Sequence, residues 1–386
     1  MYRKRRMSRR VAAMLFCALL AGGTIAAAGP ELTDAGARAG ILVEAETGTV
    51  LWEKNADERL APASITKVMT LLLAMEELER GGMTLDEKLT VSAAAASMGG
   101  SQAYMAAGET YTVEEVLKCI AVVSANDASV VMAERLAGSE AAFAEKMNAR
   151  ARELGMNDTC FCNCTGLPAE GHLTTARDVA RMSRELMKHK KILDYSTIWM
   201  DSIREGTFTL SNTNKLLKTY PGANGLKTGS TAEAGCCLAA TAERDGMTLA
   251  AVVLGAKTSN DRFASATALL DYGFAGFALC RDVPEWGYVP VDMGVETQAR
   301  PVLRETPAVV TEKSRKDAVT ARVELAETVH APVQAGQKLG EVIWSDGERE
   351  LYRAPLVAET PVERLGFGQI YGKMLEMLCC LSHNLE

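Results

Sequence analysis

The stretch "PASITKVMT", residues 62–70, places a lysine three positions after a serine, at the point where a long apolar run begins. Positions i and i+3 share one face of a helix, so the helix that we expect from Ser64 to about Arg80 would hold Ser64 beside Lys67. A hydroxyl next to an amine at a helix start is either a solvated first turn or a nucleophile with its base. Apolar residues lie on nearly every side of this helix, which predicts that it is buried.

The segments around this helix predict an antiparallel sheet covered by helices. Two strand patterns, "GILVEA" and "VLWEKN", precede the helix and are joined by the turn-forming "ETGT". Helical patterns fill residues 112–190, two strands return within residues 236–256, and "DRFASATALLDYGF" predicts a last helix. Strands from both ends with an all-helical middle indicate an α+β fold, in which helices flank an antiparallel sheet and form an inserted lobe.

The chain of 386 residues divides into four segments. Residues 1–28 contain a basic start, a short apolar run and an A-x-A-like site, which predicts a cleaved signal peptide and an exported protein. An uncleaved anchor is the alternative, but the apolar run is short for a bilayer span. Residues 29–280 form the predicted sheet-and-helix domain. Residues 281–360 alternate valine-rich runs with turn signals, which predicts a small β-rich domain, and residues 361–386 form a tail.

Charge and the tail indicate what the chain contacts. Without residues 1–28, which hold six basic residues and no acidic one, the chain carries 36 Lys and Arg against 49 Asp and Glu, which argues against nucleic acid as a partner. The pattern of the tail predicts an amphipathic helix that lies on a membrane surface. The alternative is a helix packed on a protein surface, which is favoured by a polar face that is not basic. Its apolar residues at helical spacing are Phe367, Ile370, Tyr371, Met374, Leu375, Leu378 and Leu381.

The ten cysteines do not have a layout typical of disulfides. Cys160, Cys162 and Cys164 alternate, and two further pairs are adjacent in sequence. The alternating set also lacks the C-x-x-C pairs of structural zinc sites. We therefore interpret the cysteines as small buried hydrophobic residues.

Two further motifs give the serine and lysine a chemical context. "VVSANDAS" places Ser124 and Asn126 in a break between helical patterns, and "NGLKTGST" places Lys227 at the entry to a strand. Each motif alone is compatible with a structural role, a helix N-cap for Ser124 and a basic turn for Lys227. Together and in this order, the three motifs indicate a catalytic site.

With these motifs the chain resembles the serine D-alanyl-D-alanine carboxypeptidases, which are low-molecular-mass penicillin-binding proteins with an S-x-x-K, S-x-N and K-T-G signature. The stretches that carry the likeness are "PASITKVMT", "SAND", "GHLTTARDVA", "TFTLSNTNKLL", "NGLKTGST" and "LLDYGF". The resemblance implies a β-lactamase/transpeptidase-like fold over about residues 35–280, the family's second domain to about residue 360, and a C-terminal anchor. The cysteines in "CFCNCTGL" depart from the pattern expected for that loop.

The resemblance also implies partners and a location. The expected substrate is a peptidoglycan stem peptide that ends in D-Ala-D-Ala, and β-lactam antibiotics are the expected covalent inhibitors. No metal or organic cofactor is implied. The expected location is the outer face of the cytoplasmic membrane, or the cell wall or periplasm.

Each motif residue has an expected role in this chemistry. Ser64 is the nucleophile, Lys67 is its base, and the backbone N–H groups of Ser64 and Ser230 form an oxyanion hole. Ser124 is expected to bond between Lys67 and Lys227 and to relay a proton to the leaving amine. The residues expected to bind substrate are Asn126 for an amide, Lys227, Thr228 and additionally Arg262 for the terminal carboxylate, and Gly229 and Ser230 for the chain along the strand edge.

These residues predict removal of the terminal D-alanine from stem peptides through an acyl-enzyme on Ser64. A class A-type β-lactamase is one alternative, but it usually has Asp where this chain has Ala125, and it needs a carboxylate-bearing loop for deacylation. A non-catalytic wall-binding protein is a second alternative, although it would tolerate losses in the motifs and none is seen. A Ser-His-Asp hydrolase is disfavoured because the chain lacks G-x-S-x-G, and we expect His172 to be structural.

Overall fold

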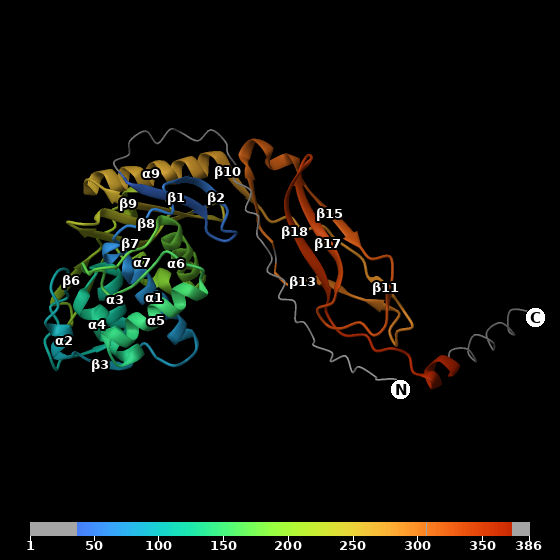
Figure 1. Ribbon diagram of the computed structural model, residues 1–386, viewed down its shortest axis with the longest axis horizontal. Helices are drawn as coiled ribbons and strands as arrows, with labels where there is room; N and C mark the ends of the chain where they lie inside the picture. Colours follow the sequence, from blue (N-terminus) through green and yellow to red (C-terminus); the bar gives the residue numbers. More distant parts are fainter. Residues whose placement is uncertain (1–36, 306, 373–386) are drawn as a thin grey trace, which may run out of the picture.

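The computed structural model describes residues 37–305 and 307–372. Figure 1 shows two parts, a mixed part of sheet and helices and a β-rich part beside it. The predicted signal peptide and the tail residues from Lys373 onward lie outside the described residues. Within the residues described, no helix has the length and apolar character needed to cross a membrane.

The mixed part is built on a five-stranded sheet in which all neighbouring strands are antiparallel. The order is β2-β1-β9-β8-β7, so the predicted opening hairpin is confirmed and β7 lies at an edge. The strands are β1 (Ala39–Glu44), β2 (Val50–Lys54), β7 (Ala223–Thr231), β8 (Gly235–Arg244) and β9 (Met247–Ala256).

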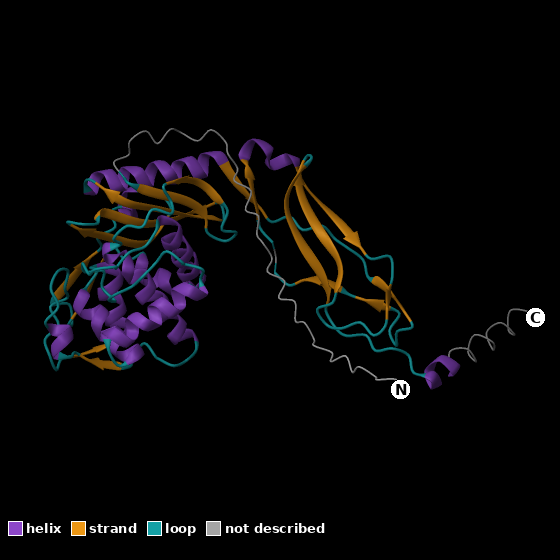
Figure 2. Cartoon of the chain, viewed as in Figure 1, coloured by secondary structure: helices purple, strands orange, loops and turns teal. Residues whose placement is uncertain are grey.

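Helices cover both faces of this sheet, as Figure 2 shows. Side chains alternate along β1, so Leu42 packs in the cluster that contains α9 (Ser259–Gly276), while Ile41 and Val43 pack in the cluster of the helical lobe. The lobe and its connections contain α2 (Ala93–Ala96), α3 (Val113–Val122), α4 (Asn126–Ala137), α5 (Glu140–Glu153), α6 (Ala176–Lys188), η2 (Lys190–Ile192), α7 (Leu193–Ser196), α8 (Leu216–Thr219), β3 (Lys88–Thr90), β4 (Thr110–Thr112), β5 (Met200–Ile203) and β6 (Phe208–Ser211).

The helix predicted from Ser64 to Arg80 is divided into two elements. A 3-10 turn, η1 (Ala63–Thr66), contains the serine, and α1 (Lys67–Glu79) begins with the lysine. Every residue from Lys67 to Met75 is buried, which confirms the prediction of a buried helix. Ala63 has a φ of +48°, so the chain enters η1 from a left-handed conformation that the sequence did not indicate.

The β-rich part begins close to the end of α9. Its first strand, β10 (Phe277–Cys280), pairs with β14 (Val309–Glu312), which joins residues of the two predicted domains in one small sheet. A four-stranded sheet has the order β13-β18-β17-β15. The remaining elements are β11 (Val289–Asp292), β12 (Gln298–Ala299), β13 (Pro301–Leu303), η3 (Lys313–Ala318), β15 (Val319–Leu325), β16 (Val329–His330), β17 (Lys338–Asp346) and β18 (Arg349–Ala358).

Candidate active site

Ser64 and Lys67 lie in hydrogen-bond contact at the junction of η1 and α1. Lys67 Nζ is 3.0 Å from Ser64 Oγ, 2.6 Å from Asn126 Oδ1 and 2.7 Å from the carbonyl oxygen of Thr165. The Lys67 side chain is fully buried, and this burial lowers its pKa to about 7. The structure thus brings together two residues of S-x-x-K and one of S-x-N.

Two glycines let other segments press against the serine turn. A Cβ at Gly166 would lie 1.8 Å from the carbonyl oxygen of Ala63, and a Cβ at Gly229 would lie 2.9 Å from the backbone nitrogen of Ser64. Because both approaches are to main-chain atoms, no side-chain rotation could relieve them. The absence of a side chain at Gly229 therefore lets the backbone of β7 lie against the serine turn, and its expected role in making room for substrate along the strand edge stays a prediction.

The loop at residues 163–166 fixes the carbonyl that Lys67 contacts. Asn163 Oδ1 accepts hydrogen bonds from the backbone N–H groups of Thr165 and Gly166, at 3.1 and 2.7 Å. The sequence analysis did not find Thr165, because a backbone carbonyl carries no residue signature. The Asn-x-x-Gly pattern within "CFCNCTGL" indicates a turn at this loop. The sequence analysis considered only the three cysteines of this stretch. The seven cysteines in the described ranges are free thiols.

His172 supports the serine turn through a hydrogen bond to Thr66. Its Nδ1 accepts from the Cys162 backbone N–H at 3.0 Å, so Nε2 carries the proton and donates to Thr66 Oγ1 at 2.8 Å. Thr66 Oγ1 in turn donates to the Ala63 carbonyl oxygen at 2.9 Å. Burial lowers the pKa of His172 to about 4, so the ring stays neutral. These contacts agree with the structural role expected for this histidine.

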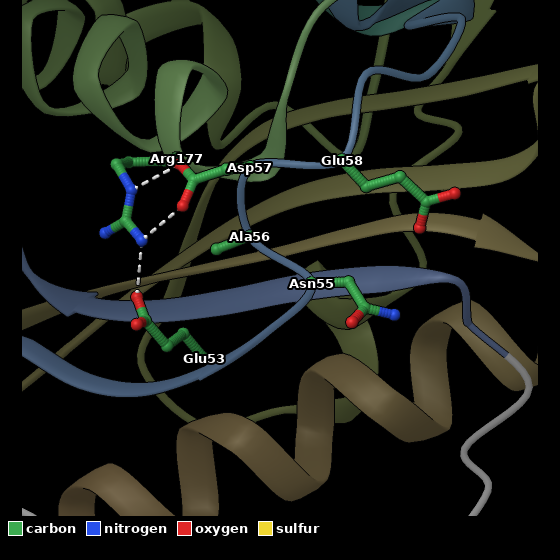
Figure 3. Close-up of a pocket in the computed structure, with 6 residues that line it drawn as sticks. All are labelled: Glu53, Asn55, Ala56, Asp57, Glu58 and Arg177. Atoms are coloured by element: carbon green, nitrogen blue, oxygen red, sulfur yellow. Dashed lines mark hydrogen bonds and ion pairs between the residues drawn. The ribbon is translucent and has the colours of Figure 1, made fainter.

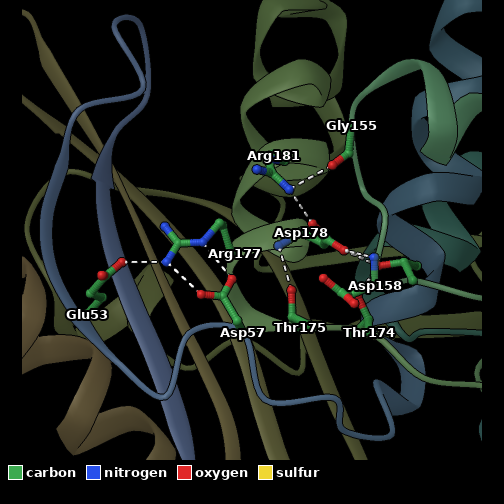
Figure 4. A network of polar contacts seen from close by, with 10 residues as sticks. Glu53, Asp57, Gly155, Asp158, Thr174, Thr175, Arg177, Asp178 and Arg181 are labelled. Atoms are coloured by element: carbon green, nitrogen blue, oxygen red, sulfur yellow. Dashed lines mark hydrogen bonds and ion pairs between the residues drawn. The ribbon is translucent and has the colours of Figure 1, made fainter. Parts of the chain in front are cut away.

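A polar network holds the start of α6 against the segment that leads to this loop (Figure 4). Arg181 donates to Asp178 at 2.6 Å and to the Gly155 carbonyl oxygen at 2.8 Å. The second oxygen of Asp178 accepts from the Asp158 backbone N–H at 3.2 Å, and Thr175 caps the helix. The stretch "GHLTTARDVA" therefore positions the site without touching the serine.

The hydrogen bonding of Ser124 differs from the predicted contacts with Lys67 and Lys227. Its Oγ is buried and has no hydrogen-bond partner among the atoms of the described chain, so the expected bonds to Lys67 and Lys227 are not found. Lys67 Nζ instead bonds to Asn126 and Thr165, which occupy its donor positions. Ser124 does not cap α4 either, because the N-cap is Ala125, and its φ of +63° places it in a left-handed conformation.

Lys227 and Thr228 lie on β7 with their side chains buried. Lys227 Nζ donates to the Thr228 carbonyl oxygen at 3.1 Å. Burial lowers the pKa of Lys227 well below its usual value, and the charges of Lys67 and Arg262 lower it further. Thr228 Oγ1 is 2.6 Å from Thr213 Oγ1, a partner that sequence reasoning did not find. Lys227 and Lys67 are thus both buried, and the charge of one disfavours the charge of the other.

Arg262 reaches β7 from α9. Its Nη1 donates to the Gly229 carbonyl oxygen at 3.0 Å, and burial lowers its pKa. The guanidinium thus lies beside the K-T-G strand and fixes the residue that contacts the Ser64 backbone. This contact with the strand adds to the carboxylate-binding role expected for Arg262.

A separate surface pocket contains none of the motif residues (Figure 3). Arg177 fills part of it and donates to Asp57 at 2.7 Å and to Glu53 at 2.8 Å. The remaining lining residues are Asn55, Ala56 and Glu58. These contacts join β2 and the following loop to α6.

Comparisons with known proteins all match this chain to D-alanyl-D-alanine carboxypeptidases or penicillin-binding proteins. Residues 25–258 match the family model Peptidase S11, described as D-alanyl-D-alanine carboxypeptidase. Residues 282–364 match the model of the penicillin-binding protein 5 C-terminal domain. The chain is 41% identical to the D-alanyl-D-alanine carboxypeptidase DacF of Bacillus subtilis (strain 168), over 86% of this chain and 87% of that relative.

Solved structures show the same similarity. Penicillin-binding protein 5 from Haemophilus influenzae matches with a TM-score of 0.78 and 26% identity, over 85% of this chain and 98% of that chain. Penicillin-binding protein D2 from Listeria monocytogenes, in an ampicillin-bound form, matches with a TM-score of 0.56 and 33% identity, over 64% of this chain and 100% of that chain. The predicted fold class, an antiparallel sheet with helices followed by a β-rich part, is confirmed.

Proposed function

The chain belongs to the D-alanyl-D-alanine carboxypeptidase family of serine peptidases, and on this premise we propose that Ser64 attacks the peptide bond between the two terminal D-alanines. The activity is that of a serine-type D-Ala-D-Ala carboxypeptidase acting on peptidoglycan, and membership of the family implies an extracytoplasmic location. Export by cleavage after Ala28 is part of the proposal. The observation that carries it is the contact between Ser64 Oγ and the buried Lys67 amine.

The hydrogen-bond groups around Lys67 match the donors and the lone pair of a neutral amine. A neutral amine has two N–H groups and one lone pair. Asn126 Oδ1 and the Thr165 carbonyl oxygen accept the two N–H groups, which leaves the lone pair for the Ser64 hydroxyl proton. Lys67 removes that proton as Ser64 Oγ bonds to the carbonyl carbon, and the backbone N–H groups of Ser64 and Ser230 stabilise the oxyanion.

The leaving D-alanine takes up the proton as the peptide bond breaks. We propose that Ser124 passes this proton from Lys67 to the leaving amine once substrate is bound, since its buried hydroxyl has no hydrogen-bond partner in the described chain and is available to make both bonds. Lys227, Thr228 and Arg262 bind the terminal carboxylate, and the second N–H of Asn126 Nδ2 binds a substrate carbonyl. Water then hydrolyses the ester on Ser64.

A β-lactamase would need a carboxylate to activate that water. Asp127, which follows the S-x-N motif, instead accepts hydrogen bonds from the backbone N–H groups of Ala103 and Met105, at 3.0 and 3.1 Å. Its oxygens therefore support a loop. Asp127 is thus engaged in these bonds, and we propose that the penicillin adduct is long-lived.

Peptide hydrolysis tests the proposal. Residues 29–386 should release D-alanine from diacetyl-L-Lys-D-Ala-D-Ala, and Ser64→Ala should abolish the release. Ser314→Ala is the matched control, since Ser314 is exposed in the β-rich part. Unchanged hydrolysis by folded Ser64→Ala would contradict the assignment of the nucleophile.

We further propose that the tail contacts a membrane surface. Phe367 and Tyr371, within a short helical segment at residues 367–372, are 87% and 59% exposed, so these apolar side chains lack cover from the described protein. Removal of residues 361–386 should abolish sedimentation with liposomes, whereas Tyr352→Ser should not, because Tyr352 is an exposed aromatic residue on β18. Equal sedimentation of the full and shortened proteins would contradict membrane contact.

A further inference from the structure

The loop that precedes Tyr104 is held directly by the S-x-N asparagine. The backbone N–H of Asn126 donates to the Ser101 carbonyl oxygen at 2.7 Å, and Asn126 Nδ2 donates to the Gly99 carbonyl oxygen at 2.6 Å. Gly100, between them, has no room for a side chain, because a Cβ would lie 2.8 Å from Asn126 Nδ2. The loop therefore lies against the residue assigned to substrate binding.

Tyr104 is presented outward from this loop in an unfavourable conformation. Its neighbours Ala103 and Met105 are buried and bonded to the Asp127 carboxylate, whereas Tyr104 is 69% exposed. Its φ of +54° is rare for a bulky residue. A strained backbone that carries an exposed aromatic ring is typical of residues that contact a ligand.

Phe208 and Arg204 of the β5–β6 hairpin hold the tyrosine in place. The Phe208 ring lies edge-on to the Tyr104 ring, with 6.3 Å between centroids. Arg204 lies 5.1 Å over the Phe208 ring and donates to the Tyr104 carbonyl oxygen at 2.7 Å. Figure 1 shows β6 and α2 along the same edge of the lobe. Two segments far apart in sequence thus build one aromatic surface, and the loop that carries Tyr104 is bonded to Asn126 through Gly99 and Ser101.

We propose that Tyr104, backed by Phe208, binds the residue that precedes D-Ala-D-Ala in the stem peptide, by packing against the aliphatic part of its side chain. This inference rests on the proposed function, in which Asn126 binds a substrate carbonyl, so the peptide passes the loop that Asn126 holds. An aromatic face gains from contact with methylene groups, and its rigid ring loses little conformational entropy on binding. Tyr104 is thereby a specificity residue for the acyl side of the substrate.

Two substrates that differ only at this residue test the inference. For diacetyl-L-Lys-D-Ala-D-Ala, Tyr104→Ala should lower kcat/KM by about tenfold, the scale of one lost aromatic contact. For acetyl-Gly-D-Ala-D-Ala, which lacks the side chain, kcat/KM should change by less than about twofold. Tyr104→Phe keeps the ring and should behave as the unmodified protein. Tyr288→Ala is the matched control, since Tyr288 is 59% exposed in the β-rich part.

Three results would overturn the inference. Equal losses for both substrates would assign Tyr104 a structural role in the loop. No loss for either substrate would remove it from peptide binding. A loss seen only with a disaccharide-linked peptide would assign the ring to a sugar. Failure of the nucleophile assignment is distinguished separately, because unmodified protein would then form no penicillin adduct on Ser64.

Discussion

The protonation state of Lys67 controls the predicted rate. Burial lowers its pKa to about 7, partly opposed by the nearby Cys164 and Asp127. Below that pH the protonated amine cannot accept the Ser64 proton, so acylation by penicillin should slow as the pH falls through about 7 and should level off above it. Single-turnover acylation rates across this range measure the midpoint. His172, with a pKa of about 4, is not the titrating group, so a midpoint that disappeared in His172→Gln would contradict this account.

Replacing Lys67 should separate chemistry from stability. Lys67→Ala should slow acylation by at least about a hundredfold, the scale of losing a general base. The fold should survive, because the amine is buried at a desolvation cost that alanine does not carry. The measurements are adduct formation by mass spectrometry and the thermal unfolding midpoint. Acylation at the unmodified rate would exclude Lys67 as the base.

The sequence predicted side chains at the site more readily than backbone atoms. Ser64, Lys67 and Asn126 were brought together as the motifs implied, because each motif specifies a side-chain type. The Thr165 carbonyl was missed, since any residue can supply that atom. The expected Ser124 bonds depend on the direction of Lys67 Nζ, which is decided by tertiary contacts that a motif does not encode.

At the scale of elements, the approach of the residue 163–166 loop to η1 is the critical contact. Gly166→Ala should lower acylation by about tenfold or more, because its Cβ would collide with the Ala63 carbonyl oxygen and displace the serine turn. Gly171→Ala is a closely matched control, with a φ of +81° against +83° and nothing within 4 Å of its Cβ. Acylation rates and unfolding midpoints of both variants should be compared. Equal effects would show that backbone strain alone matters.

The elements themselves were largely predictable. Alternating strands and amphipathic helices gave the correct fold class, because burial periodicity is a local property. The division of the first helix into η1 and α1 was missed, since it depends on the left-handed conformation of Ala63, a residue type that does not favour it. The pairing of β10 with β14 was also missed, because partners thirty residues apart leave no local pattern.

At the scale of the whole molecule, we predict that the β-rich part positions the protein and takes no part in the reaction. In the described residues, the side chains of Ser64, Lys67 and Lys227 bond to residues of the sheet-and-helix part. Truncation after residue 281 should leave peptide hydrolysis within about threefold, as expected of an independent domain. Stability should fall, because the cut leaves β10 unpaired. Loss of activity from a folded truncation would contradict the prediction.

The mass of the protein after exposure to penicillin tests the central claim most directly. A penicillin offers a strained amide and a carboxylate, and its leaving amine stays tethered after Ser64 opens the ring. Residues 29–386 should therefore gain the mass of one penicillin, the gain should map to Ser64, and Ser64→Ala should show none. Folded, unmodified protein that acquired no adduct would contradict the assignment of Ser64 as the nucleophile, and an adduct lost within seconds would indicate a β-lactamase instead.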